Sequence, residues 1–289
     1  MKKGIIYALI TAILFVTLEP VSKLVANDVS PYAITFWRFL IGSLILVPPA
    51  TAKIKREKIH ISAKDIGLMT GLGTLFICVS MILLQLAVKK ADSPSLIAII
   101  FSSNSVFTII FAVLLVKEEH LNKNKLIALI LGISGVIICA DFSSGTNTES
   151  VVLAILAALS FSLYTALSQK YMKRLGGLIQ SSGVFLSGSI VLLIILLIFK
   201  VDISLPVKMY DLSIMLYLGL LVTGTGYALY FKAIEKGGAI MASLAFFIKP
   251  ILTPFVTLII NNIVPDVKVF IAVALIVLAS YFSAYRKNN

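Results

Sequence analysis

Ten long apolar segments occupy almost the whole chain and constrain its fold more than any other feature. They are 17 to 23 residues long, with short hydrophilic connections between them: 4–24, 32–52, 66–88, 94–116, 125–141, 151–170, 180–199, 211–231, 238–260 and 267–285. A helix of roughly 20 apolar residues crosses the hydrocarbon core of a bilayer. Because 59% of the residues are hydrophobic and only 13% are charged, we expect an all-α polytopic membrane protein with ten transmembrane helices.

The formal net charge of +12 would suggest a nucleic-acid partner in a soluble protein. Here the excess lies in the short connections, so no nucleic acid is expected. With the N-terminus placed in the cytoplasm, 17 of the 25 Lys and Arg residues fall on the inner side and 6 on the outer side. Cytoplasmic loops of membrane proteins are enriched in these residues. We therefore expect a multi-pass protein of the cytoplasmic membrane with a retained first span and both termini inside.

The chain also repeats itself at an offset of 146 residues. The matching positions are Ala12 with Ala158, Phe15 with Phe161, Ser22 with Ser168, and 87–90 with 233–236. Residues 1–145 and 146–289 would then each hold five segments, and an odd number inverts the second half in the membrane. Inverted repeats are typical of secondary transporters, whose substrate site lies near the midplane between the repeats. The alternative is chance similarity between two apolar stretches.

A lysine lies in the middle of the ninth apolar segment. Lys249 is 11 residues from each end of 238–260, so its Cα would lie about 17 Å from either end of that helix. A cation at this depth is costly unless it meets a partner or a water-filled cavity. Pro250 and Pro254 lack a backbone N–H and would free carbonyls beside it. The sequence leaves two roles open: Lys249 binds substrate, or it pairs with Glu19 or with these carbonyls.

Glu19 is the only acidic residue well inside an apolar segment. It could carry a proton or receive a substrate ammonium, or it could pair with Lys23, one helical turn on, or with Arg38. Pro20 should bend the first helix, which favours a gate or a cavity wall. Arg38 is interpreted as a residue that ties the second helix to a neighbour near the outer gate. Counting Arg38 and Lys249 against Glu19 leaves one net positive charge, which favours an anionic substrate.

Weaker candidates surround these charges. Ser103 and Asn104 in the fourth segment match Lys249 and Pro250 at the offset of 146 residues. Their alternative role is hydrogen bonding between helices. Three further residues could line a cavity or simply pack in the core: Gln85, Tyr164 and Tyr227.

Glycines in the third and eighth segments predict close helix approach, at Gly67 and Gly71 and at Gly219 and Gly224. They do not form a phosphate-binding loop, because the sequence contains no G-x-x-x-x-G-K-[ST] motif. Both cysteines fall inside apolar segments, and no cluster of metal ligands or nucleophile–base arrangement is legible. We therefore expect no cofactor, no metal and no enzymatic activity.

The chain resembles the EamA-type permeases, the ten-span members of the drug/metabolite transporter superfamily. The resemblance lies in the helix at 31–40 with its embedded Arg38, the helix ending at 114–119, the glycine pair within 132–136, and the helix ends at 86–89 and 231–234. Three positions depart from the family pattern. Asn104 stands where a proline is common, 261–265 lacks the expected glutamate, and Lys249 stands where an acidic or apolar residue is frequent.

The resemblance implies a central cavity lined by spans one, three, four, six, eight and nine, and alternating access by rocking of helices. It leads us to expect a secondary transporter that exports a small polar metabolite, amino-acid-like or carboxylate-bearing. Lys249 would neutralise a carboxylate, and Glu19 would receive an amino group or a coupling proton. The alternatives are proton-coupled efflux of organic cations or drugs, and a non-transporting membrane subunit. The sequence leaves the substrate, the coupling ion and the choice between monomer and homodimer open.

Overall fold

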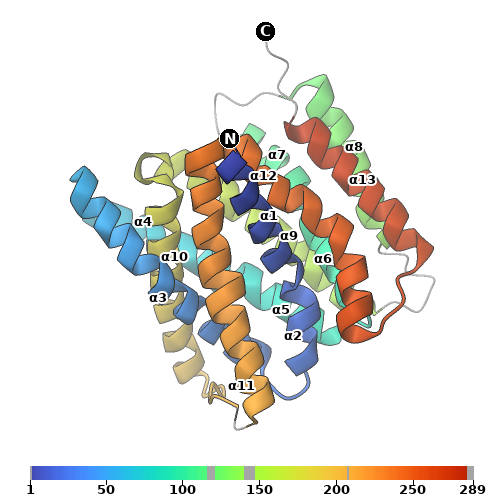
Figure 1. Cartoon of the computed structure of the whole chain (residues 1–289), viewed down its shortest axis with the longest axis horizontal. Helices are drawn as coiled ribbons and strands as arrows, with labels where there is room; N and C mark the ends of the chain where they lie inside the picture. Colours follow the sequence, from blue (N-terminus) through green and yellow to red (C-terminus); the bar gives the residue numbers. More distant parts are fainter. Residues whose placement is uncertain (1, 116–120, 140–146, 207, 285–289) are drawn as a thin grey trace.

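The computed structural model of the chain describes residues 2–115, 121–139, 147–206 and 208–284. All the regular elements in these ranges are helices, packed into one bundle, and the start of the first and the end of the last lie at the same end of the view (Figure 1). In chain order they are α1 (Lys2–Val16), α2 (Leu18–Val25), α3 (Pro31–Glu57), α4 (Ala63–Gly73), η1 (Thr74–Met81), α5 (Ile82–Lys90), α6 (Pro94–Ser102), α7 (Asn104–Leu115), α8 (Lys123–Cys139), α9 (Thr148–Met172), η2 (Lys173–Leu175), α10 (Gly176–Ile198), α11 (Met209–Leu216), η3 (Tyr217–Thr225), α12 (Gly226–Asn261) and α13 (Val267–Ala284). The predicted all-α class is confirmed for the described residues.

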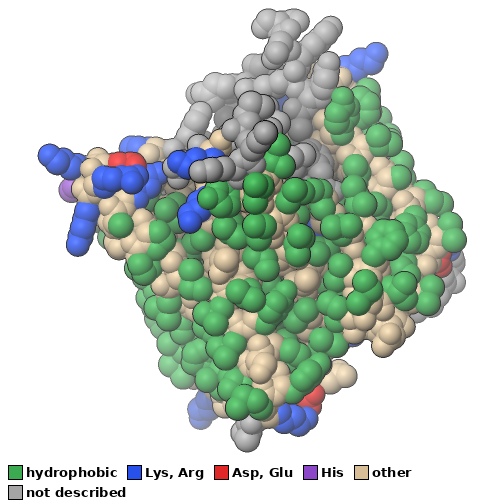
Figure 2. Space-filling view, viewed as in Figure 1, with side chains coloured by type: hydrophobic (Ala, Val, Ile, Leu, Met, Phe, Trp, Pro, Cys, Tyr) green, Lys and Arg blue, Asp and Glu red, His purple; other side chains and the backbone are tan. Residues whose placement is uncertain are grey.

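Seven stretches of the described chain are long and apolar enough to cross a membrane: Gly4–Val25, Pro31–Glu57, Ala63–Lys90, Pro94–Leu115, Thr148–Gln169, Gly176–Ile198 and Met209–Ala233. Two shorter apolar helices, Ile248–Asn261 and Val267–Phe282, fall on the predicted ninth and tenth segments. Hydrophobic side chains cover the flank of the molecule, and Lys and Arg side chains gather toward its ends (Figure 2). The chain is a multi-pass membrane protein, while the count of ten spans stays a prediction. Of the expected helix ending at 114–119, only 114–115 lies within the described residues.

α12 is continuous in its backbone, yet it turns back on itself. The ring centroids of Tyr230 and Phe246 are 5.4 Å apart, whereas sixteen residues of straight helix would separate them by about 24 Å. Phe15 of α1 contacts both arms, because its ring lies 5.0 Å from Tyr227 and 6.0 Å from Phe246. α12 therefore joins the end of the eighth predicted segment, which otherwise consists of α11 and η3, to the ninth, and α1 packs along α12 (Figure 1).

Two of the predicted transmembrane segments are broken at their centres. Between α1 and α2, Thr17 Oγ1 donates to the carbonyl of Leu14 at 2.7 Å, and Pro20 cannot donate to the carbonyl four residues before it. Between α6 and α7, Ser103 Oγ donates to Ile100 O, and Asn104 Nδ2 donates to Phe101 O, both at 2.6 Å. Side chains that bond nearby carbonyls compete with the regular helical ladder. Pro250 and Pro254, in contrast, lie inside α12 without ending it.

Helix packing follows the offset of 146 residues. At this offset α3 corresponds to α10, and α4 with η1 corresponds to α11 with η3. α10 packs against α4 and η1, and α3 packs against η3. α8 and α13 correspond to each other and pack together. The second long helix of each half therefore crosses the third of the other half, as inverted repeats would require.

The closest of these crossings joins Gly73 of α4 to Gly188 of α10. A Cβ on Gly73 would lie 2.6 Å from the carbonyl oxygen of Val184, and a Cβ on Gly188 would lie 2.7 Å from the carbonyl oxygen of Gly73. Both obstacles are backbone atoms, so no side-chain movement could relieve them. A Cβ on Gly67 or Gly71 would meet nothing within 4 Å.

The close approach predicted at Gly67 and Gly71 is therefore wrong, because α4 presents Gly73 to its neighbour instead. The approach predicted in the eighth segment is confirmed. There, Gly219 and Gly224 pack against side chains of α3.

Candidate functional site

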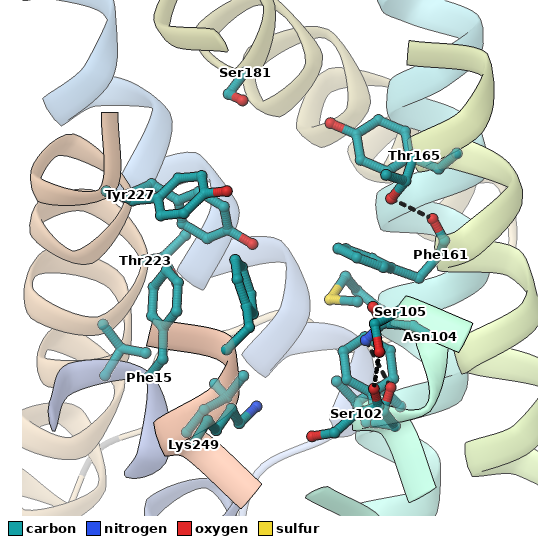
Figure 3. Close-up of a pocket in the computed structure, with 18 of the residues that line it drawn as sticks. Phe15, Ser102, Asn104, Ser105, Phe161, Thr165, Ser181, Thr223, Tyr227 and Lys249 are labelled. Carbon is teal, nitrogen blue, oxygen red and sulfur yellow. Dashed lines mark hydrogen bonds between the residues drawn. The ribbon is translucent and has the colours of Figure 1, made fainter. Parts of the chain in front are cut away.

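A cavity of about 400 Å³ lies between helices of both halves of the chain. Helices from the first half supply Phe15, Arg38 and Asn104, and helices from the second half supply Tyr164 and Lys249. In Figure 3 two sides face each other, with Phe15, Thr223, Tyr227 and Lys249 on one and Phe161, Thr165, Ser102, Asn104 and Ser105 on the other. The volume is that of a pocket for a small molecule.

Some of the residues that line the cavity correspond to each other in the internal repeat. Four pairs of lining residues are separated by 146 positions: Phe15 and Phe161, Leu18 and Tyr164, Met81 and Tyr227, and Leu84 and Tyr230. Positions that correspond at the repeat offset therefore line the same cavity from both halves of the chain. In three of the four pairs the second half places a tyrosine where the first half places an aliphatic or thioether side chain. The two sides consequently share a shape and differ in their hydrogen-bonding groups.

Lys249 pairs with Glu19. Its Nζ donates to Glu19 Oε1 at 2.7 Å and lies 5.8 Å from the ring centroid of Phe101. Lys249 lines the cavity and is 7% exposed, whereas Glu19 is fully buried behind it and does not line the cavity. The second carboxylate oxygen of Glu19, Oε2, has no hydrogen-bond partner. Lys249 could have paired with a carboxylate or with freed backbone carbonyls, and the structure shows the pair with the Glu19 carboxylate.

Lys23 does not pair with Glu19, although it lies one helical turn away. Its Nζ donates to the carbonyl oxygens of Lys89 and Ala91, at 3.0 and 2.5 Å. These carbonyls lie at the end of α5, where a cation is favourable because the last carbonyls have no intrahelical donor. Lys23 therefore joins α2 to the end of α5 and leaves Glu19 to Lys249.

Arg38 lines the cavity with little compensation for its charge. It is 3% exposed. Its Nη2 contacts Met81 Sδ at 3.4 Å, and its Nε has no partner. The guanidinium carbon lies 4.6 Å from the ring centroid of the adjacent Phe39. No carboxylate in the described part of the chain lies within ion-pair distance of it. The guanidinium was expected to donate to several acceptors at once. In the structure it contacts one acceptor, the thioether sulfur of Met81.

The remaining predicted residues divide between the cavity and the core. Asn104, Tyr164 and Tyr227 line the cavity, and Asn104 O accepts hydrogen bonds from Ser162 Oγ and Thr108 Oγ1 at 2.8 and 2.7 Å. Five predicted residues are buried away from the cavity: Gln85, Ser103, Pro20, Pro250 and Pro254. Gln85 Nε2 has no partner there. The roles assigned to these residues stay predictions.

Several lining residues were not among the predicted ones. They are mostly aromatic or hydroxyl-bearing: Phe15, Phe161, Phe246, Thr165, Ser181, Thr223 and Ser280. One signal could have found two of them. Phe15 and Phe161 are identical at the repeat offset, and identity across a symmetry axis points to positions near that axis.

The electrostatic balance of the site follows from these contacts. Lys249 and Glu19 neutralise each other, so Arg38 leaves the cavity with one net positive charge. No acidic residue appears among the described residues that line it. No group of three His, Cys, Asp or Glu in the described ranges could hold a metal ion. The arrangement can bind a small molecule with one negative group, and it places no nucleophile beside a base.

The chain is similar to known membrane transporters over its whole length. The model of the EamA-like transporter family matches residues 2–140 and again 148–285. An uncharacterized transporter of Clostridium kluyveri is 32% identical over 300 aligned residues, with 100% of this chain and 96% of that protein covered. An uncharacterized transporter of Bacillus subtilis is 27% identical over 231 residues, which cover 77% of this chain and 72% of that protein.

A solved crystal structure of a protein shares the fold. It matches with a TM-score of 0.66 and covers 98% of this chain and 97% of its own, at 16% sequence identity. At this identity the likeness supports the fold alone. The two matches to one family model fall on the two halves that share the cavity. The chain belongs to the EamA-like transporter family.

Proposed function

We propose that the protein is a secondary transporter that exports a small, carboxylate-bearing metabolite across the cytoplasmic membrane by alternating access. The observation that carries this proposal is the cavity between the two halves, which holds two buried cations and no acidic side chain among its described lining residues. A non-transporting subunit would place these charges at dry helix interfaces. A cavity between the two halves with buried cations in its lining supports transport instead.

The ten-span arrangement is part of the same proposal. Residues 1–145 and 146–289 would be two five-helix repeats, inverted relative to each other, with α11, η3 and the first arm of α12 as the eighth span and the second arm of α12 as the ninth. The reciprocal crossings of α3 with η3 and of α10 with α4 support this arrangement.

The lining favours an anion over an organic cation. A cation exporter needs a carboxylate that its substrate or a proton can reach, whereas Glu19 is fully buried and bonded to Lys249. The cation that faces the cavity without a carboxylate is Arg38. Proton-coupled efflux of cations therefore finds less support in this site than movement of a carboxylate.

Counterflow in proteoliposomes tests the proposal. Purified protein is reconstituted in vesicles loaded with unlabelled carboxylic acids, and uptake of the same labelled acid is measured. We expect uptake above that of protein-free vesicles for at least one carboxylate, and none for quaternary ammonium compounds. Exchange of the ammonium compounds with no carboxylate exchange would contradict the proposal and favour cation efflux.

A further inference from the structure

We propose that the cavity takes a monoanionic aromatic carboxylate, and that Arg38 rather than Lys249 receives its carboxylate group. This inference rests on the proposed function and narrows its substrate class. Three observations support it: the compensation of the two cations, the rings that line the cavity, and the absence of an acidic receptor for an amine.

The two cations differ in how far their charge is compensated. Lys249 already donates to a carboxylate at 2.7 Å. Arg38 is buried with an unpartnered Nε, a ring contact to Phe39 and one hydrogen-bond contact, to the sulfur of Met81, and a thioether is a weak acceptor. Burying an uncompensated charge is costly. A carboxylate in the cavity would remove that cost, since the guanidinium fork matches a carboxylate in bidentate geometry.

The aromatic side chains that line the cavity indicate that the ligand itself carries an aromatic ring. Nine aromatic side chains line it: Phe15, Phe39, Phe101, Phe161, Tyr164, Tyr227, Tyr230, Phe231 and Phe246. On one side the ring of Phe15 contacts Tyr227 and Phe246. On the other the ring of Phe161 contacts Phe101 and Tyr164, at 5.3 and 5.8 Å. These sides face each other across the cavity (Figure 3), and a flat aromatic body fits between them through offset and edge-to-face contacts.

An amine on the ligand would find no acidic partner among the described residues that line this cavity. The described lining contains no Asp or Glu. One oxygen of Glu19 is engaged by Lys249, and the residue as a whole is inaccessible. An ammonium group would therefore be desolvated near two cations, with no acidic residue to compensate it. The cavity chemistry selects an aromatic acid over an aromatic amino acid, and excludes an aromatic amine.

Calorimetric titration of the purified, full-length protein tests the inference with four probes. They are 3-phenylpropionate, L-phenylalanine, 2-phenylethylamine and hexanoate, which separate the effects of the carboxylate, the amine and the ring. We expect 3-phenylpropionate to bind most tightly, L-phenylalanine and hexanoate more weakly, and 2-phenylethylamine not at all.

Variants of Arg38 test whether this residue binds the carboxylate of the ligand. Arg38→Gln should weaken binding of 3-phenylpropionate about 10- to 100-fold, the usual worth of a charge-assisted hydrogen bond to a buried group. Arg38→Lys keeps the charge and loses the fork, so it should weaken binding by less. Arg56→Gln is the matched control, because Arg56 lies on the same helix with its side chain 77% exposed; it should leave the affinity unchanged.

A readout without ligand separates binding from a purely structural role. Unliganded Arg38→Gln should melt no lower than the parent protein, because it removes a buried charge that has no ion-pair partner within contact distance among the described residues. A clear fall in its melting temperature, or an affinity that neither Arg38 variant changes, would overturn the role of Arg38.

Equal affinity for hexanoate and 3-phenylpropionate would overturn the aromatic preference, and tighter binding of L-phenylalanine would overturn the exclusion of the amine. In each of these cases carboxylate counterflow would persist, so the proposed function would stand. Absence of any carboxylate counterflow by the parent protein is the separate result that overturns the proposed function itself.

Discussion

Replacing Lys249 alone with methionine should lower the free energy of unfolding by about 3–5 kcal/mol. The substitution leaves the carboxylate of Glu19 fully buried without its only hydrogen-bond partner, and breaking a buried ion pair from one side carries a cost of this size. The measurement is unfolding in detergent micelles by a denaturing surfactant, followed by circular dichroism, with parent and variant in the same micelle.

The matched control is the double variant Glu19→Gln/Lys249→Met, which removes both charges. Because replacing a whole buried pair with neutral groups is often close to neutral in stability, the double variant should recover most of the loss. The coupling energy from the full double-mutant cycle should then be large and favourable. If the single and double variants unfold at the same surfactant concentration, the pair does not act as a unit and the expectation fails.

The second large effect is expected where α4 crosses α10. Gly73→Ala should destabilise the protein by about 1–3 kcal/mol or more, since its Cβ would meet backbone atoms of Val184 and Gly188 and the two helices would have to separate. Gly188→Ala should act similarly, because its Cβ would meet the carbonyl of Gly73. Thermal melting followed by fluorescence-detected size exclusion measures both.

Gly71→Ala provides the control on the same helix. A Cβ there meets nothing within 4 Å, and alanine is a better helix former than glycine by about 1 kcal/mol. This variant should therefore melt at or slightly above the parent temperature. A Gly73→Ala protein that melts together with Gly71→Ala would show that the crossing tolerates a methyl group, contrary to the geometry.

Much of the architecture could be predicted from the sequence because helices that span a membrane require long, almost uncharged apolar segments. Apolar segments of span length must be helical to satisfy their backbone groups. The offset of 146 residues anticipated which helices correspond. Likewise, Lys249 was recognisable as a buried charge from its depth alone, and Glu19 was already one of its possible partners.

The rest depended on the direction in which side chains point. Segment boundaries do not fix the rotation of a helix, so Ser103 and Gln85 could not be separated from Asn104 and Tyr164 as residues away from the cavity. The break at Ser103 shifts this rotation further. For the same reason, the spacing of Gly67 and Gly71 suggested a contact that the neighbouring helix does not make.

The lack of a direct ion pair for Arg38 in the described part of the chain was equally hidden from the sequence. It arises because Glu19 forms its ion pair with Lys249, which lies 230 positions away in the sequence.

The crossings between the two halves set the order in which the molecule can be assembled. Gly73 leaves the ribosome 115 residues before Gly188, the glycine against which it packs. The separation is larger still for Glu19, because its partner Lys249 lies in the ninth apolar segment, 230 residues later in the chain. During synthesis the first half would therefore sit in the bilayer without the helices that cover Gly73 and without the lysine that pairs with Glu19. Its native packing is completed only after the second half has been inserted, so the final folding step is a late docking of two incomplete halves.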